Sequence, residues 1–171
     1  MIIGIAGRKR SGKDTVASLI VNEFGFVNYA LSTPIKFMLQ SIGFYEPDNK
    51  EEIIAPALPV SYRHLVQTLG TDWGRNLVDK GFWLFYLEAL SIKANKIVVS
   101  DVRFQNEVDW IIDRGGFVIE LHRDTGLVDP HESELVELQN TIVIDNNGTY
   151  EELYNHVRSI VTQNLFVGHS D

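Results

Sequence analysis

The chain has 171 residues, of which 44% are hydrophobic, so it can bury one well-packed core but is too short for two full-sized domains. It has no cysteine, which excludes disulfide bridges and thiolate zinc sites, and its 23 acidic against 15 basic residues disfavour unspecific binding to long polyanions. Because neither a secretion signal nor an apolar run of membrane length is present, we expect a cytoplasmic protein with small-molecule partners, no long nucleic acid and no membrane.

The first part of the sequence predicts two strands and two helices. Ile2 to Ala6 is a short apolar strand pattern, and after a polar loop apolar residues recur at helical spacing until Gly25. FVNYA, which begins at Phe26, predicts a second short strand, and Thr33 followed by proline predicts the start of a second helix. The three prolines between Phe44 and Tyr62 favour a loop or mobile excursion with little regular structure.

The second part of the sequence predicts helices and three more strands. Residues 63–94 have a helical composition that glycines interrupt. Buried-type strands follow at 96–100, 117–121 and 141–144, with a helical pattern between the first two, and a capping box that begins at Thr149 (TYEE) starts a closing helix. Five short apolar strands that alternate with helices predict an α/β fold with a parallel sheet covered on both faces, because parallel neighbours need crossover connections.

The stretch GRKRSGKDT, Gly7 to Thr15, has the spacing G-x-x-x-x-G-K and lies between a predicted strand and a predicted helix, as a phosphate-binding loop should. In such loops, glycines let backbone N–H groups turn inward around phosphate oxygens, the helix N-terminus adds partial positive charge, and Lys13 bridges the outer phosphates. The alternative is a glycine-rich turn with a solvated lysine. The candidate nucleotide-binding residues are Gly7, Lys9, Arg10, Ser11, Gly12, Lys13, Asp14 and Thr15.

One position departs from the usual loop, because Asp14 stands where a hydroxyl should follow the lysine and the hydroxyl of Thr15 comes one place later. Nucleoside monophosphate kinases of the adenylate kinase type also lack a hydroxyl directly after the lysine, and by that resemblance Thr15 contacts phosphate. Asp14 is then either a first-turn acid favoured by the helix dipole or an oxygen ligand of Mg²⁺. Arg8, Lys9 and Arg10 either reduce the repulsion between that carboxylate and the phosphates or form a solvated basic turn.

Asp101 follows the buried strand 96–100, where a carboxylate at the carboxyl end of a parallel strand faces the ligand crevice and can organise Mg²⁺. A turn or a helix cap is the alternative role. Arg103, which follows closely, is a candidate for catalysis and substrate binding, with a structural salt bridge as its alternative. The candidate metal ligands are therefore Asp14 and Asp101.

Five blocks of sequence together resemble one family: GRKRSGKDT, YRHLVQTLGTDWGR from Tyr62, SDVRFQNE from Ser100, FVIELHR from Phe117 and HESE from His131. They resemble the deoxynucleoside monophosphate kinases of bacteriophages and their bacterial relatives, and LGTDWGR with DVRFQNE is the most specific combination. The resemblance implies ATP-dependent phosphorylation of deoxynucleoside monophosphates to diphosphates. It also implies ATP and Mg²⁺ as cofactors, and a homodimer is the candidate assembly.

The same resemblance assigns domains and further site residues. It implies a three-layer P-loop kinase core (1–43 and 95–165), a helical monophosphate-binding excursion (about 44–94) and a small lid (about 122–138). Arginines suit phosphoryl transfer because it spreads charge over equatorial oxygens, although each could instead form a surface ion pair. Arg75 lies in LGTDWGR beside two glycines that permit close backbone approach. The expected catalytic residues are Lys13, Asp101, Arg103 and Arg123, and the expected substrate-binding residues are Arg63, Gln67, Thr71, Arg75, Arg103 and His131.

Two other functions remain as alternatives. A nucleotide-regulated binding module could use the same loop, but the guanine-reading pattern N-K-x-D is absent, since Asn95 and Lys96 are followed by Ile97 and Val98. A kinase for another small phosphorylated metabolite could carry a similar SGKD loop. Only the segment around LGTDWGR argues against that second alternative.

Overall fold

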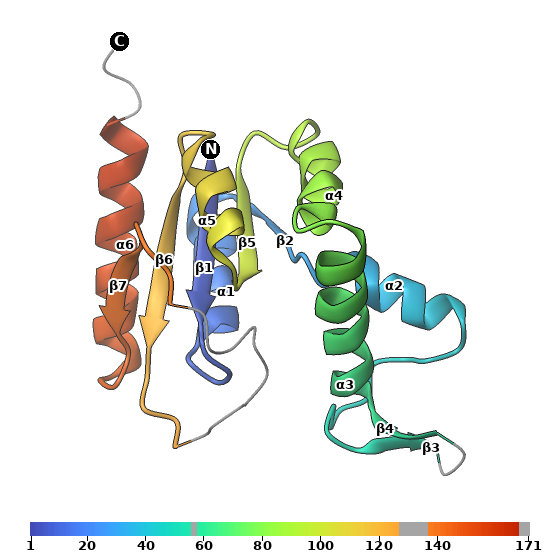
Figure 1. Cartoon of the computed structure of the whole chain (residues 1–171). Coiled ribbons are helices and arrows are strands. Elements are labelled where there is room, and N and C mark those ends of the chain that lie inside the picture. The colour runs from blue at the N-terminus through green and yellow to red at the C-terminus, as the bar shows by residue number, and fades with distance from the viewer. Residues whose placement is uncertain (56–57, 127–136, 168–171) are drawn as a thin grey trace. The chain divides into compact units, whose positions relative to one another are not determined.

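The computed structural model of the protein describes residues 1–55, 58–126 and 137–167 (Figure 1). The chain divides into two compact units. We call Met1–Tyr29 together with Ala94–Asp171 the sheet unit, and Ala30–Lys93 the inserted unit, because it interrupts the sheet unit in sequence. None of the helices in the described ranges is long and apolar enough to cross a bilayer.

The sheet unit is built on five strands in the order β2-β5-β1-β6-β7, and every neighbouring pair is parallel. This confirms the predicted α/β fold. The central strand is apolar and buried along Ile2 to Ala6, as expected for a strand covered on both faces. The strands are β1 (Ile2–Gly7), β2 (Val27–Tyr29), β5 (Ile97–Val102), β6 (Phe117–His122) and β7 (Ile142–Asp145).

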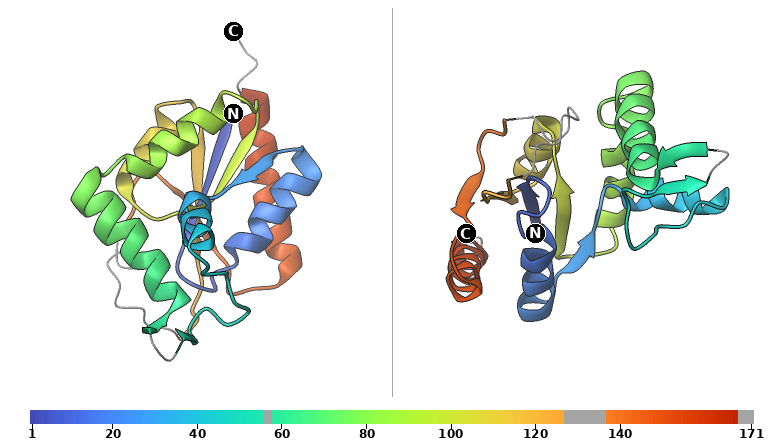
Figure 2. Two further views of the ribbon diagram at one scale, coloured as in Figure 1. Left: turned by 90° about the vertical axis from the view of Figure 1, so that its right-hand side faces the viewer. Right: turned by 90° about the horizontal axis from the view of Figure 1, so that it is seen from below.

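Three helices cover this sheet: α1 (Lys13–Phe24), α5 (Gln105–Ile112) and α6 (Tyr150–Val167). Helices α1 and α6 lie on one face and α5 lies on the other, which gives three layers (Figure 2). The buried core on the α1 and α6 face includes Ile20, Val157 and Val161. The predicted capping box of α6 is present, because Glu152 N donates to Thr149 Oγ1 (3.2 Å) and Thr149 N donates to Glu152 Oε2 (2.7 Å).

The inserted unit contains more regular structure than the sequence predicted. The segment 44–62 was expected to have little, yet β3 and β4 form an antiparallel pair within it, with Ile53 opposite Ser61. Pro59 is tolerated in β4 because the pair has an irregular register there and only two strands, so the missing N–H breaks no central ladder. The elements of this unit are α2 (Thr33–Ser41), β3 (Ile53–Ala55), β4 (Leu58–Ser61), α3 (Tyr62–Gln67), η1 (Thr68–Val78) and α4 (Phe82–Ser91).

The helix that α3 begins widens into the π-helix η1, where Asp79 N donates to Gly74 O. The predicted helical composition is confirmed, but the π form was not predicted. The side chain of Trp83 on α4 packs against η1, and its Nε1 donates to Gly70 O at 2.7 Å. A Cβ at Gly74 would lie 2.6 Å from the Trp83 ring, so the missing side chain at this glycine makes room for the indole.

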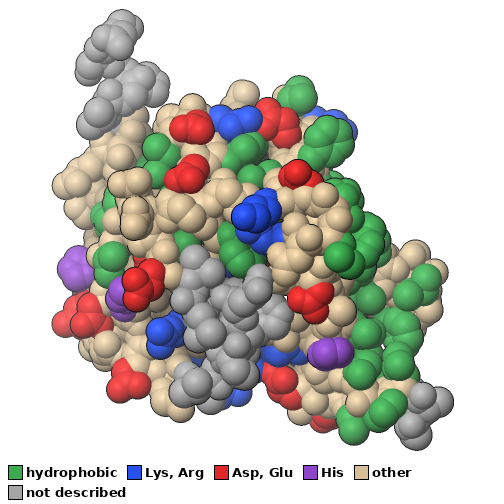
Figure 3. All heavy atoms as spheres, in the orientation of Figure 1, with side chains coloured by type: hydrophobic (Ala, Val, Ile, Leu, Met, Phe, Trp, Pro, Cys, Tyr) green, Lys and Arg blue, Asp and Glu red, His purple; other side chains and the backbone are tan. Residues whose placement is uncertain are grey.

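Large apolar side chains are exposed on the inserted unit, and they form part of the apolar (green) surface in Figure 3. Phe37, Ile42 and Tyr45 are 61%, 69% and 68% exposed. In contrast, Tyr62 is buried, and burial together with the nearby Glu46 carboxylate raises the pKa of its phenol.

Candidate active site

The predicted phosphate-binding loop connects β1 to α1 in the sheet unit. Its backbone has a positive φ at Gly7 (138°) and Gly12 (103°), which glycine accepts without strain, and also at Arg10 (63°), where a side chain makes that conformation uncommon. The Lys13 ammonium donates to the carbonyl oxygens of Gly7 (2.7 Å) and Arg8 (2.9 Å), so the loop curls around its own lysine. This is the shape in which consecutive backbone N–H groups can surround an anion.

Neither motif glycine has room for a side chain. A Cβ at Gly7 would lie 2.6 Å from both Leu121 O and Ser11 Oγ, and a Cβ at Gly12 would lie 2.6 Å from Asn146 Nδ2. Ser11 is completely buried, and its hydroxyl has no hydrogen-bond partner among the described residues. The loop is therefore packed tightly against the ends of β6 and β7.

The two residues after Lys13 face solvent. Asp14 and Thr15 are exposed in the first turn of α1, where the helix dipole favours an acid. Both interpretations of Asp14 are compatible with this position, because an exposed first-turn carboxylate can stabilise the helix and can also ligate a metal.

Asp101 does not follow the strand, as expected, but lies within β5, which continues to Val102. Gly4 pairs with Val99 and Ala6 pairs with Val102, so β5 has one more residue than β1 between these pairs. Such a bulge bends a strand and changes the direction of a side chain, and bulges are over-represented beside active sites. Asp101 still lies at the carboxyl end of β5, as expected.

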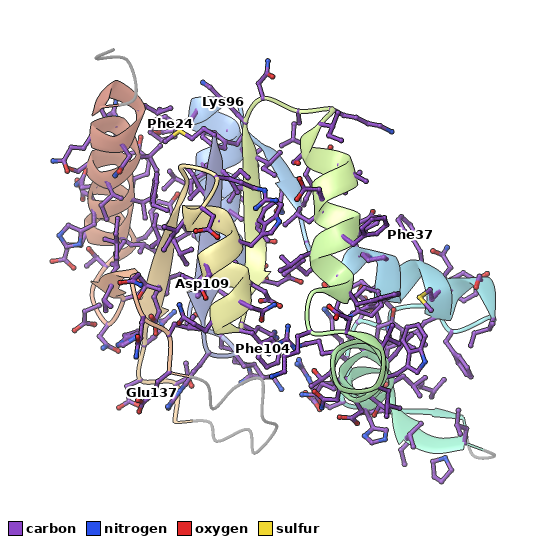
Figure 4. All side chains as sticks on the ribbon, turned by 45° about the horizontal axis from the view of Figure 1, so that its top comes forward. Phe24, Phe37, Lys96, Phe104, Asp109 and Glu137 are labelled. Atoms are coloured by element: carbon purple, nitrogen blue, oxygen red, sulfur yellow. The ribbon has the colours of Figure 1, made fainter. Side chains whose placement is uncertain are left out.

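The turn from β5 into α5 is held by a residue that the sequence analysis did not select. Glu107 is 4% exposed, and its Oε2 accepts hydrogen bonds from the backbone N–H groups of Arg103 (2.8 Å) and Phe104 (3.1 Å). Phe104 lies at this end of the sheet unit, and Lys96 and Phe24 lie at the other (Figure 4). The spacing of a glutamate three residues after a helix start was available in the sequence as a signal.

A pocket of about 730 Å³ opens at the carboxyl ends of the strands, where open α/β sheets bind ligands. It brings together Gly7, Arg103 and Arg123, three predicted site residues from separate segments, and it also includes Arg8. Lys13, Asp14 and Asp101 are not among the described residues that line it. The acidic lining residues are Glu120, Asp124, Glu137 and Asp145.

Hydrogen bonds fix the acidic side of this pocket. Glu120 contacts His122 Nε2 (2.8 Å) and accepts from Thr141 Oγ1 (2.6 Å). Asn147 Nδ2 donates to Asp145 Oδ1 (2.6 Å), while Asn147 Oδ1 accepts from Asp124 N (2.9 Å). Glu137 lies near the same end of the unit (Figure 4).

Four predicted substrate-binding residues lie on α3 and η1 in the inserted unit. Arg63 Nε bonds Glu51 Oε1 (2.5 Å), and Arg75 is buried with its Nη1 donating to Lys80 O (2.9 Å). Thr71 is buried as well, and Gln67 Nε2 is a buried donor with no partner in the described part of the chain. His131 lies outside the described residues.

A five-stranded parallel sheet with a G-x-x-x-x-G-K loop between its first strand and first helix defines the class of P-loop kinases by fold. Shikimate kinase from Aquifex aeolicus has a TM-score of 0.60 and 16% identity, covering 96% of this chain and 98% of that one. A gluconokinase from Sinorhizobium meliloti has a TM-score of 0.53 and 17% identity, covering 98% and 96%. At these identities the likeness establishes the fold alone.

The family is established by sequence. The profile of deoxynucleotide monophosphate kinase matches residues 1–58 and 42–157. An Acanthamoeba polyphaga mimivirus protein, provisionally named deoxynucleotide monophosphate kinase, is 33% identical over 94% of this chain and 96% of its own length. The deoxynucleotide monophosphate kinases of Enterobacteria phage T4 (23% identity, 92% of this chain, 97% of its own) and Escherichia phage RB69 (34%, 59% and 45%) are also similar.

The chain therefore belongs to the deoxynucleotide monophosphate kinase family. It is an enzyme, a nucleotide kinase, and membership of a kinase family implies ATP as its phosphoryl donor. The predicted family and the predicted enzyme class are both confirmed.

Proposed function

We propose that this enzyme transfers the γ-phosphoryl group of ATP to deoxynucleoside monophosphates and releases ADP and deoxynucleoside diphosphates. The observation that carries the proposal is the loop between β1 and α1, curled around Lys13, in a chain of this family. A loop of this shape suits the phosphates of a nucleotide and offers nothing that would select a neutral ligand.

On the donor side, the loop is proposed to hold the phosphates of ATP through its backbone N–H groups, with Lys13 on the outer phosphates. Lys13 would exchange its bonds to the Gly7 and Arg8 carbonyls for phosphate oxygens. Thr15, two residues further on in the first turn of α1, would contact phosphate. The proposed nucleotide-binding residues remain Gly7, Lys9, Arg10, Ser11, Gly12, Lys13, Asp14 and Thr15.

The residues present fit Mg²⁺ bound together with ATP. Mg²⁺ usually keeps several waters and takes one or two carboxylates plus substrate phosphates, so it does not require a cage of protein ligands. No group of three or more acidic or histidine ligands occurs in the described ranges, and Asp14 and Asp101 supply two carboxylates near the loop end of the sheet unit. When bound, the ion would neutralise charge on the phosphates.

For the transfer itself, Arg103 and Arg123 are proposed to stabilise the charge that develops on the equatorial oxygens. Their presence in one pocket with Gly7 supports this role, because the loop and both arginine residues then line the same space. A planar guanidinium remains charged at every working pH and can donate two parallel hydrogen bonds.

On the acceptor side, the excursion (about 44–94) is proposed to bind the monophosphate through Arg63, Gln67, Thr71 and Arg75. The burial of Thr71 and Arg75 on a π-helix supports this, since π-helical turns occur frequently at functional sites. Arg103 is proposed to contact the acceptor too. His131, in the segment assigned as the lid (about 122–138), is proposed to contact the substrate, although it lies outside the described residues.

The test is a coupled assay of ADP release with ATP and a panel of deoxy- and ribonucleoside monophosphates. We expect release to depend on at least one deoxynucleoside monophosphate. ADP release that depends only on a phosphorylated metabolite without a base would contradict the proposal.

A further inference from the structure

Asn146, directly after β7, is one of the few buried polar residues of the sheet unit, with 7% of its surface exposed. Its backbone N donates to His122 O at the end of β6 (2.7 Å), and its side-chain Nδ2 donates to Ser11 O inside the phosphate loop (2.8 Å). One residue thus joins the ends of two strands to a loop 135 positions away in sequence.

The bond to Ser11 O determines which way a peptide group of the loop points. A trans peptide is planar, so its C=O and N–H point in opposite directions. Since the Ser11 carbonyl is directed at Asn146, the N–H of Gly12 is directed the opposite way. An anion site at a helix N-terminus needs N–H groups turned inward and carbonyl oxygens turned outward, because an inward oxygen would repel phosphate.

Gly12 and Asn146 fit each other sterically. Gly12 has φ 103°, a conformation that favours glycine, and a Cβ there would lie 2.6 Å from Asn146 Nδ2. The absence of a side chain at Gly12 therefore serves the close approach of the asparagine amide as well as the backbone turn.

We propose that Asn146 is a positioning residue for the phosphoryl donor, which holds the Ser11–Gly12 peptide in its phosphate-binding orientation. Its amide is engaged with the loop carbonyl and acts through the loop, not on the reacting atoms. The inference rests on the proposed phosphate-binding function of the loop.

The first test measures binding of inorganic tripolyphosphate and of ATP to the parent enzyme, Asn146→Ala and Asn164→Ala by calorimetry. Asn164→Ala is the matched control, because Asn164 Nδ2 also donates to a backbone carbonyl, that of Ile160 (2.9 Å), but within α6. We expect Asn146→Ala to weaken the binding of both ligands at least about tenfold, since a buried carbonyl loses its donor. In steady-state kinetics KM for ATP should rise while KM for the acceptor stays the same, and Asn164→Ala should match the parent.

A second variant gives a signature that a purely structural role would not produce. In Asn146→Asp a carboxylate faces Ser11 O, and the two acceptors repel each other, but the protonated acid can donate as the amide did. We expect tripolyphosphate affinity, relative to the parent, to recover as the pH falls from about 8 to about 5.5, because burial raises the pKa of a carboxyl group.

Asn146→Ala should show no such recovery. The titratable residues of the elements that meet here are Glu120 and His122 on β6, Asp145 on β7, Lys13, Asp14 and Glu23 on α1, and Arg8, Lys9 and Arg10 in the loop. Both variants retain all of these residues, so their titration cancels in the comparison.

Three outcomes would overturn the proposal. If folded Asn146→Ala binds tripolyphosphate as tightly as the parent does, the loop does not need the hydrogen bond from Asn146. If the affinity for ATP falls but the affinity for tripolyphosphate does not, Asn146 acts on the nucleoside part of ATP and not on its phosphates. If Asn146→Ala does not fold, Asn146→Asp decides, and relative affinity that stays flat with pH overturns the proposal. A parent that binds no tripolyphosphate would overturn the proposed loop function itself.

Discussion

Asp14 occupies a position where most phosphate loops carry a hydroxyl, and its exposed carboxylate lies in the first turn of α1. We expect Asp14→Asn to raise the Mg²⁺ concentration needed for half-maximal activity, because an amide is a weaker ligand of a hard cation. The measurement is a Mg²⁺ titration at fixed ATP. If the Mg²⁺ dependence is unchanged and only stability falls, by under about 1 kcal/mol, Asp14 serves the helix dipole instead.

Arg75 is buried, and its guanidinium group is permanently charged and can donate two parallel hydrogen bonds. Arg75→Lys keeps the charge but loses the fork, so we expect kcat/KM for the acceptor to fall at least roughly tenfold, equivalent to about 1.5 to 3 kcal/mol, with little change in KM for ATP. Steady-state kinetics with each substrate varied in turn measures both sides.

Arg114→Lys is a suitable control for this variant, because Arg114 is exposed and its Nη1 also donates to a backbone carbonyl, that of Trp110 (3.3 Å). It should leave both constants unchanged. If Arg75→Lys loses ATP affinity instead, or loses nothing, the acceptor role of Arg75 is wrong. Urea unfolding of both variants separates a binding defect from the loss of the Lys80 contact.

The phosphate loop was predictable because its residues are contiguous and their spacing follows from how a backbone surrounds an anion. Glu107 was missed although a glutamate three residues after a helix start is a capping signal, whereas Asn146 was missed because its role depends on a contact with a loop distant in sequence. Asn146 could have been found by the argument that selected Asp101, since each is a polar residue at the carboxyl end of an apolar strand pattern.

At the scale of elements, the π-helix η1 depends on the packing of Trp83 against Gly70 and Gly74. We expect Gly74→Ala to destabilise the protein by about 1 to 3 kcal/mol, since the new methyl group would collide with the indole, although the better helix propensity of alanine offsets up to about 1 kcal/mol. Urea unfolding measures this. Gly74→Ala should lower the free energy of unfolding by less in a Trp83→Phe background. An equal loss in both backgrounds would contradict the steric explanation.

Lys36 on α2 and Lys50 both pair with Glu46 in the segment that follows α2. Burial tends to raise the pKa of Glu46, but the hydrogen bonds and charges of the two lysines outweigh it and lower the pKa below the ordinary value of 4.5. A lowered folded-state pKa stabilises the protein above that value, and the stabilisation is lost as the pH falls through the folded-state pKa.

We therefore expect Glu46→Gln to cost under about 1 kcal/mol at neutral pH, because the pair is screened by solvent. The difference from the parent should shrink in acid, which urea unfolding at a series of pH values measures. In a background with Lys36→Met and Lys50→Met only the burial of Glu46 remains, which raises the pKa, so the pH dependence should reverse its sign. A pH dependence that keeps its original sign there would assign the effect to another group.

The elements of the sheet unit were predicted better than those of the inserted unit, for a physical reason. A strand buried on both faces needs an apolar run, which is visible in the sequence. The β3–β4 pair was missed because its prolines favour a loop, although Pro59 fits at an irregular position. The π form of η1 was missed because a π-helix of 11 residues is rare, so a helical composition predicts the α form.

For the whole molecule, ligand binding and folding should be coupled through the phosphate loop. ATP at about 100 times its dissociation constant should stabilise the parent by about 2.7 kcal/mol against unfolding. Lys13→Ala should remain folded, since Lys13 is only half-buried, but should lose phosphoryl transfer and most of this stabilisation at the same ATP concentration. Turnover equal to that of the parent in the folded variant would refute the phosphate-loop function.

The strand order has a consequence for how the protein is made. β1 is synthesised before the other strands of its sheet and lies at the centre of that sheet, yet both of its neighbours come much later in the sequence, with Ile2 opposite Ile97 and Ile3 opposite Phe117. Pairing at such sequence separation slows folding and leaves the apolar run IIGIA exposed during synthesis, when chaperones are most needed. The phosphate loop is therefore synthesised long before its hydrogen bonds are complete, because the Ser11 carbonyl gains its donor only after Asn146 has been added.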